Sequence, residues 1–284
     1  MSAAAESSAS FAEACGPRSL GDGTFITSLR SEWSIGGHPH GGFLIALIAR
    51  TATAMMADHG EPAADPLSVS AEFLRATNLG PVLLRTEVRK AGRQTTVIAV
   101  RLEQRGRTCV EAMVTVGRLP AQRALWSDLP VLPAEPPVNA ITLGENMGRG
   151  VFRLAEDCEV RMDASTAPFL TGRRLRLPAG PRERPPSLRL RLWARPRSAD
   201  VDPYFALLSG DINPPVPFSL GRTGWSPTVQ MTSFIRARPS PGWLRVQVDC
   251  RAVYGNWFDS DATVLDSTGQ LICQARQLAI TPGP

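Results

Sequence analysis

The residues from His38 to Gly42, HPHGG, place two histidines two positions apart, ahead of a glycine pair and an apolar run. Such a segment could hold a metal, cradle a phosphate or begin a buried helix. Zinc needs three or four ligands, and no cysteine or carboxylate stands at a matching distance along the chain. The glycines match neither GxGxxG nor GxxxxGK, the patterns of nucleotide-binding loops. We therefore interpret the segment as a helix start, in which Gly41 and Gly42 let another backbone come close.

A helix start also presents free N–H groups that suit a carbonyl oxygen or an oxyanion. His40, Gly41 and Gly42 are therefore candidate substrate-binding residues. The stretch that follows, 43–48, is apolar on nearly all sides, and a helix of that kind must be buried all round.

A second candidate is Asp211, which lies in YFALLSGDINPP at 204–215. The first part of this stretch predicts a short apolar helix, and the aspartate follows its end. In the first interpretation, the carboxylate acts as a general base that takes a proton from water. In the second interpretation, an aspartate followed by Asn213 and two prolines only ends the helix or forms a turn. Both interpretations stay open at this point.

The elements that position these residues can be inferred from an internal repeat. FLRA at 73–76 aligns with FIRA at 234–237 at an offset of 161, and Gly106 aligns with Gly269 at an offset of 163. Each half carries runs typical of strands, which in the first half are about 67–76, 82–90, 94–104 and 108–118. A buried helix followed by an antiparallel meander is a compact α+β unit, here present twice.

This organisation predicts a flexible leader at 1–19, a first domain at 20–120, a Pro-rich linker at 121–144 and a second domain at 145–284. The N-terminus lacks the basic and apolar regions of a signal peptide, and no apolar stretch is expected to reach the length of a membrane span. We therefore expect a cytoplasmic protein.

The repeat also singles out polar residues in the second half. Alternation along the last strand places Gln277 on the inward face, where the first half has Val114. On the neighbouring strand, a row of mainly apolar residues becomes polar: Leu67, Val69, Ala71 and Phe73 align with Thr228, Gln230, Thr232 and Phe234. A buried polar group left unpaired costs about 1–3 kcal/mol, so these groups should face each other or a ligand. Either the chain has one polar site in its second half, or that face is exposed to solvent.

Taken together, these features resemble the double hotdog fold, in which two units with a helix wrapped by an antiparallel sheet pack as a pseudo-dimer. The similarity is to the acyl-CoA thioesterase II-like group, over roughly 20–120 and 145–282. It rests on the GG-helix, the FLRA…GP strands, SGDINPP (209–215), PTV (227–229) and GQLICQARQLAI (269–280). The resemblance implies hydrolysis of the thioester of fatty acyl-CoA without a metal or cofactor.

By motif, the resemblance places the family's catalytic aspartate, threonine and glutamine on Asp211, Thr228 and Gln277. An Asp-His pair often follows the family's threonine closely, and here Gln230 and Met231 occupy those places. Gln230 and Thr232 are further candidates for substrate contacts. HGG also resembles the helix start of single-hotdog thioesterases, which carry a carboxylate about two turns later. Here that position is Ala49, so the acid is expected in the other half.

Composition narrows the function class. The net charge of +5 is nearly all arginine, without a basic run interleaved with aromatics, so nucleic acid is not an expected partner. The five cysteines are scattered and form no CxxC, which argues against disulfides and zinc.

Two alternatives to a thioesterase remain. The first is a hotdog enoyl-CoA hydratase or dehydratase, disfavoured because the second half has no histidine. The second is a non-catalytic acyl-CoA-binding protein. Self-association into a homo-oligomer is plausible.

Overall fold

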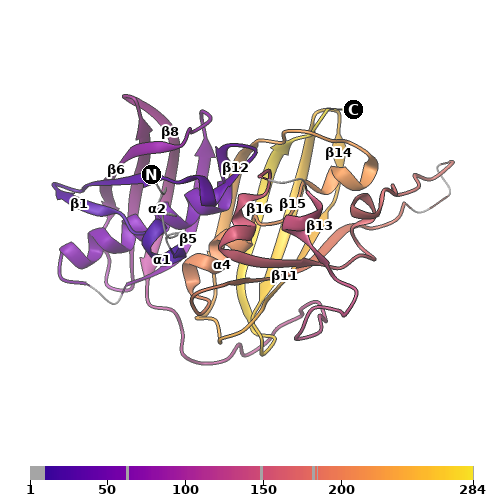
Figure 1. Cartoon of the computed structure of the whole chain (residues 1–284). Helices are drawn as coiled ribbons and strands as arrows, with labels where there is room; N and C mark the ends of the chain where they lie inside the picture. Colours follow the sequence, from indigo (N-terminus) through magenta and orange to yellow (C-terminus); the bar gives the residue numbers. More distant parts are fainter. Residues whose placement is uncertain (1–9, 62–63, 148–149, 181–182, 184, 284) are drawn as a thin grey trace, which may run out of the picture.

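The computed structural model contains two α+β units that share one antiparallel sheet (Figure 1). It describes residues 10–61, 64–147, 150–180, 183 and 185–283. The helices are α1 (Phe11–Ala14), α2 (Gly41–Asp58), α3 (Leu143–Asn146) and α4 (Pro203–Ser209). The strands of the first half are β1 (Arg18–Gly21), β2 (Thr24–Leu29), β3 (Ser34–Ile35), β4 (His38–Pro39), β5 (Asp65–Phe73), β6 (Gly80–Lys90), β7 (Thr95–Gln104) and β8 (Arg107–Gly117). Those of the second half are β9 (Ile141–Thr142), β10 (Cys158–Met162), β11 (Leu188–Pro196), β12 (Thr228–Ile235), β13 (Leu244–Cys250), β14 (Val253–Tyr254), β15 (Trp257–Leu265) and β16 (Leu271–Ile280).

The two halves join at the middle of the sheet. The strand order is β1-β2-β6-β7-β8-β5-β12-β16-β15-β13-β11-β10-β9, so the only link between the halves in this order is the antiparallel pair β5 and β12. In that pair Val69 lies opposite Ser233 and Ala71 lies opposite Met231. Helix α2 packs on β5 to β8, and α4 packs on β12, β13 and β16. A helix held against an antiparallel sheet, twice in one chain, is the double hotdog fold, and this prediction is confirmed.

Helix α2 is the central helix of the first half. Every residue from Gly42 to Ala49 is buried, as the apolar sequence predicts. The helix begins two residues earlier than Phe43, because the His40 side chain caps it by accepting the Phe43 N–H. By length and composition α2 could cross a membrane, so the expectation that no apolar stretch reaches that length is wrong; 67% of the helix is buried inside the protein.

Helices α2 and α4 lie against each other in opposite directions. Gly42 at the start of α2 meets Leu208 near the end of α4. At the other end of this contact, the Thr53 and Tyr204 hydroxyls hydrogen-bond at 2.7 Å. The start of α2 therefore lies beside the loop that follows α4, which contains Asp211.

The segment predicted as a flexible leader is partly ordered. Residues 1–9 lie outside the described residues, but α1 forms within the segment and buries Phe11. The Phe11 ring lies 5.2 Å from Trp33, 6.3 Å from Phe43 and 5.5 Å from Phe205, measured between ring centroids. The prediction of a loose segment is wrong for 11–14, because Phe11 fills a gap between the two central helices.

Strand β12 differs by one residue from the alignment made on the sequence. Its buried residues are Met231, Ser233 and Ile235, whereas Phe234 is 46% exposed. A bulge between Thr228 and Gln230 causes this shift, because one extra residue reverses the face of every side chain beyond it. Thr228, before the bulge, remains on the inner side.

The hydrogen bonds at the ends of the two central strands show the same shift. The Leu74 N–H donates to the Cys109 carbonyl, and the Arg236 N–H donates to the Ile272 carbonyl, both at 2.8 Å. Leu74 therefore corresponds to Arg236, although the sequence alignment matched it to Ile235. The structural offset between the two halves at this point is therefore one residue larger than the offset obtained by matching FLRA with FIRA.

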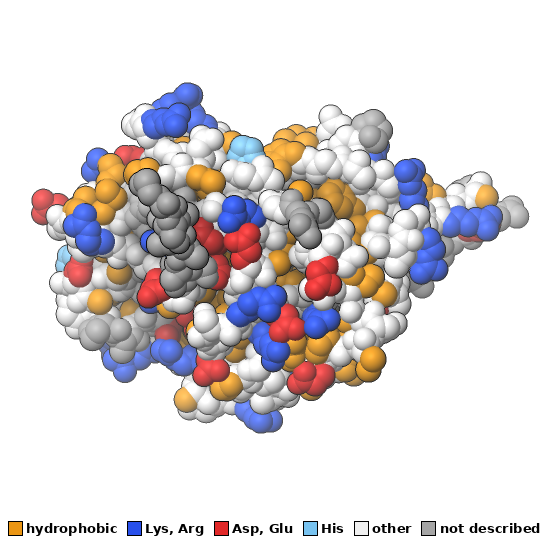
Figure 2. Space-filling model, in the orientation of Figure 1, with side chains coloured by type: hydrophobic (Ala, Val, Ile, Leu, Met, Phe, Trp, Pro, Cys, Tyr) orange, Lys and Arg blue, Asp and Glu red, His pale blue; other side chains and the backbone are white. Residues whose placement is uncertain are grey.

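One face of the molecule carries charged side chains of both signs (Figure 2). On the face drawn in Figure 2, arginine and lysine side chains alternate with aspartate and glutamate across both halves. The excess of arginine therefore makes no continuous basic surface on that face.

Candidate active site

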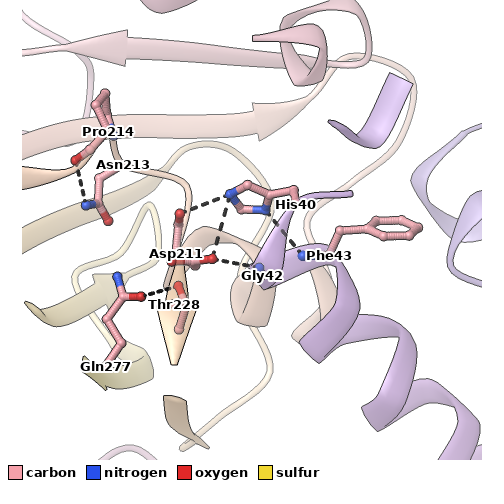
Figure 3. A network of polar contacts seen from close by, with 8 residues as sticks. All are labelled: His40, Gly42, Phe43, Asp211, Asn213, Pro214, Thr228 and Gln277. Atoms are coloured by element: carbon pink, nitrogen blue, oxygen red, sulfur yellow. Dashed lines mark hydrogen bonds and ion pairs between the residues drawn. The ribbon is translucent and has the colours of Figure 1, made fainter. Parts of the chain in front are cut away.

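Asp211 lies in the loop directly after α4 and is buried. Its carboxylate oxygen Oδ2 accepts the N–H of Gly42 at 2.8 Å, at the start of α2 in the other half of the chain (Figure 3). Both the free N–H and the positive end of the helix dipole favour a negative charge here. The structure thus joins Asp211 to the HGG segment, which the sequence treated as separate candidates.

The glycine pair makes this contact possible. A Cβ atom on Gly41 would lie 2.7 Å from Asp211 Oδ2, and one on Gly42 would lie 2.6 Å from the Leu208 carbonyl oxygen. Both separations are far shorter than real Cβ contacts, so any larger residue would push the two helix ends apart. The prediction that the glycines allow a close backbone approach is confirmed.

His40 links the same two segments. Its Nδ1 accepts the Phe43 N–H at 3.3 Å, so the ring proton must be on Nε2, which donates to the main-chain oxygen of Asp211 at 3.0 Å. The same Nε2 lies 3.8 Å from Asp211 Oδ2. Burial lowers the pKa of His40, although the Asp211 carboxylate opposes this effect. His40 is therefore a neutral side chain that fixes the loop carrying Asp211.

This contact corrects one argument from the sequence. A hydratase was disfavoured because the second half has no histidine, but the first half supplies His40 to the second half's aspartate. An Asp-His pair therefore exists, across the two halves. Chain position gave no sign of it, since the two residues are 171 positions apart.

Thr228 and Gln277 lie next to each other on β12 and β16. The Thr228 hydroxyl donates to Gln277 Oε1 at 2.7 Å, which leaves the amide nitrogen of Gln277 as a donor. Gln277 is buried on the inner face of β16, as alternation predicts, and Val114 is the buried residue at the matching place in the first half. Figure 3 shows Asp211, Thr228 and Gln277 converging from three separate elements.

The pKa of Asp211 reflects this enclosed setting. Burial raises it above the ordinary value of an aspartate, while the Gly42 N–H and hydrogen bonding by the Gln277 side chain lower it again. A carboxylate with a raised pKa is a stronger base once ionised, and the Gly42 N–H stabilises that ionised form.

Gln230 and Thr232 do not join this group. The Gln230 amide donates to the Thr232 hydroxyl at 2.9 Å, and that hydroxyl hydrogen-bonds Ser70 on β5 at 2.9 Å. They lie on the opposite face of the sheet from Gln277, because the bulge follows Thr228. The expectation that they share the inner face with Thr228 is therefore wrong.

The histidines do not belong to a metal-binding cluster of described residues. Within the described part of the chain, no group of three or more His, Cys, Asp or Glu side chains could hold a metal ion. His38 instead packs on Trp225, with ring centroids 4.8 Å apart.

The fold is that of a double hotdog protein, and the family models make the chain a thioester hydrolase of this class. Two family models agree with that class: the acyl-CoA thioesterase N-terminal domain matches residues 29–117, and the C-terminal domain matches residues 128–281. The chain belongs to the acyl-CoA thioesterase family.

Individual relatives extend over almost the whole chain. An uncharacterized protein of Mycobacterium tuberculosis is 40% identical over 276 residues, covering 91% of each chain. A Thermobifida fusca structure assigned as thioesterase II has a TM-score of 0.80 and 25% identity, covering 95% of this chain and 97% of that one. Acyl-CoA thioesterase II TesB2 of Mycobacterium marinum has a TM-score of 0.67 at 15% identity, covering 97% and 99%, and shares the fold.

Proposed function

We propose that the protein hydrolyses fatty acyl-CoA to the free acid and CoA, using a water molecule activated by Asp211. The observation that carries this proposal is the convergence of a buried carboxylate with the hydrogen-bonded pair of Thr228 and Gln277. The three groups provide a base, an acceptor and a donor within one enclosed site, which is what the addition of water to a thioester requires.

In the proposed reaction, Asp211 takes one proton from the water as its oxygen attacks the thioester carbonyl. The Thr228 hydroxyl already donates its proton to Gln277 Oε1, so the Thr228 oxygen accepts the second hydrogen of the water. The Gln277 amide nitrogen donates to the water oxygen and aims it. The tetrahedral intermediate then collapses, the carbon–sulfur bond breaks, and the proton held by Asp211 passes to the departing CoA thiolate.

The start of α2 supports the negative charge that develops on the carbonyl oxygen. The first four N–H groups of a helix have no partner within it. Those of His40, Gly42 and Phe43 donate to the Trp33 carbonyl, to Asp211 and to the His40 ring. We assign the remaining one, from Gly41, to the substrate oxygen; Gly41 lies directly beside the Asp211 carboxylate.

A covalent route through Thr228 has less support. A threonine nucleophile needs a base to take its proton. The Thr228 hydroxyl instead donates to an amide oxygen, which is not a base at neutral pH. Attack by water therefore fits these contacts better than an acyl-enzyme intermediate.

Hydration of an enoyl-CoA is the second candidate, favoured by the Asp211–His40 pair. Both ring nitrogens of His40 are already used, one by the Phe43 N–H and one by the Asp211 main chain. A free base nitrogen is what this chemistry would require, so hydrolysis is the better-supported reaction.

One experiment separates the candidates. The purified protein is incubated with saturated acyl-CoAs of several chain lengths and with a 2-enoyl-CoA, while free thiol and loss of the enoyl double bond are measured. Hydrolysis predicts thiol release from at least one saturated acyl-CoA. Loss of the double bond without thiol release would identify a hydratase. Acyl-CoA binding with neither reaction would identify a non-catalytic binding protein, and either result would overturn the proposal.

A further inference from the structure

Asn213 carries a buried hydrogen-bond acceptor that no described residue uses. The side chain is 9% exposed, and its amide nitrogen donates to the Pro214 carbonyl at 3.0 Å. A carbonyl oxygen can only accept, so the NH2 end must face Pro214, and this fixes the direction of Oδ1. Among the described residues, none donates a hydrogen bond to that oxygen.

The sequence explains why the loop cannot satisfy this oxygen itself. An asparagine in a turn commonly accepts the backbone N–H two residues later. In the run Asn213-Pro214-Pro215 the next two residues are both prolines, which have no N–H. An unpaired buried acceptor is unfavourable, so an external donor would relieve this cost.

The position of Asn213 connects this oxygen to the site. It lies two residues after Asp211, and in Figure 3 its nitrogen turns toward Pro214 while its oxygen turns to the side on which Gln277 lies. The attacking water already has its partners, since Asp211 and Thr228 accept its two hydrogens and Gln277 donates to its oxygen. The Gln277 amide has two hydrogens, of which one serves Asp211 and the other is assigned to the water, so the donor for Asn213 should come from the substrate.

The geometry points to the amide N–H of a pantetheine arm. This inference rests on the proposed function. In every pantetheine thioester an amide N–H lies two carbons from the thioester sulfur, close to the reacting carbonyl. Asn213 would act as a positioning residue, accepting this N–H and holding the thioester against the water. CoA and acyl carrier proteins both carry this arm, so Asn213 could serve either carrier.

Two small substrates with the same acyl group test this contact. One is the N-acetylcysteamine thioester, which has the amide N–H, and the other carries an ester oxygen in place of that N–H. The wild-type protein is expected to favour the amide substrate by about fivefold to tenfold in kcat/KM, as for one neutral hydrogen bond. Asn213→Ala should bring the ratio close to one. A ratio measured within each protein sample is insensitive to partial misfolding. Gln274→Ala, on the outer face of β16, is the matched control and should keep the wild-type ratio.

Comparing two substrates that carry the same acyl group, one on CoA and one on an acyl carrier protein, identifies the carrier that the protein accepts. Asn213→Ala should lower kcat/KM for whichever carrier the wild-type protein accepts. If the wild-type protein hydrolyses both small substrates equally well, or if Asn213→Ala keeps the preference, this inference is wrong and the proposed function still stands. If the wild-type protein hydrolyses no thioester, the proposed function fails and this inference fails with it.

Discussion

Asp211→Asn separates the proposed proton-accepting role of this side chain from its structural role. An asparagine has nearly the same shape, and its Oδ1 can still accept the Gly42 N–H that Asp211 accepts at 2.8 Å. The variant therefore keeps the contact between the two halves but loses the base. General base catalysis is worth about 10²–10⁴-fold, so kcat should fall at least 100-fold. That loss corresponds to about 2.7 kcal/mol or more of transition-state stabilisation.

The change in folding stability caused by the same substitution has a definite sign. Burial raises the pKa of Asp211, so the ionised carboxylate is less favourable in the folded chain than in the unfolded chain. For such a group, the stabilising contribution is present below the unfolded pKa and is lost as pH rises through the folded pKa. At neutral pH the asparagine variant should therefore melt no lower than wild type. Its advantage should shrink as the pH falls.

Two measurements decide this prediction. Release of free thiol under saturating acyl-CoA gives kcat, and thermal unfolding across a pH series gives the stability difference. Asp128→Asn, an exposed residue of the linker, is the control and should change neither. Near-normal hydrolysis by Asp211→Asn would refute the assignment of the base. A strong drop in melting temperature would show instead that the carboxylate is needed for folding.

Further predictions concern the surroundings of this residue. Hydrolysis by the wild type should decline on acidification at a pH above the ordinary aspartate range, because the pKa of Asp211 is raised; a pH-rate profile that stays flat there would contradict this. Gly42→Ala should lower both the melting temperature and kcat, since its Cβ would lie 2.6 Å from the Leu208 carbonyl; unchanged values would refute the close-contact argument. Phe11→Ala should cost about 3–5 kcal/mol in a denaturant titration, because the ring fills the core; a cost below about 1 kcal/mol would show that α1 is dispensable. Thr228→Val should reduce kcat with little change in melting temperature, and a proportionate loss of both would point to a structural role.

Much of the fold could be predicted from the sequence because local patterns determine it. The run at 43–48 is apolar on every side, and it forms the buried helix. Alternation in the last strand correctly placed Gln277 inside, since β16 contains no bulge near that residue. The matching Val114 is also buried, so the contrast between the halves is real.

The sequence-based predictions failed in two places: at a bulge of one residue, and at contacts between segments that are distant in the sequence. The bulge after Thr228 has no signature in the letters around it, and it reversed the faces expected for Gln230 and Thr232. The contact between His40 and Asp211 depends on how α2 and α4 dock, which no local pattern encodes. For the same reason α1 was missed, because its four residues gain their order from packing on both helices.

Because the polar group draws on both halves, the proposed catalysis depends on their docking. His40 and Gly42 come from one half and Asp211 from the other, and in the strand order of the sheet the halves meet only where β5 pairs with β12. Enzyme activity is therefore a direct reporter of that junction. Two fragments produced separately by cutting the exposed stretch at 121–128 would each lack part of the site. Their mixture should regain thioester hydrolysis only as β5 and β12 pair again, which makes the chain suitable for fragment complementation.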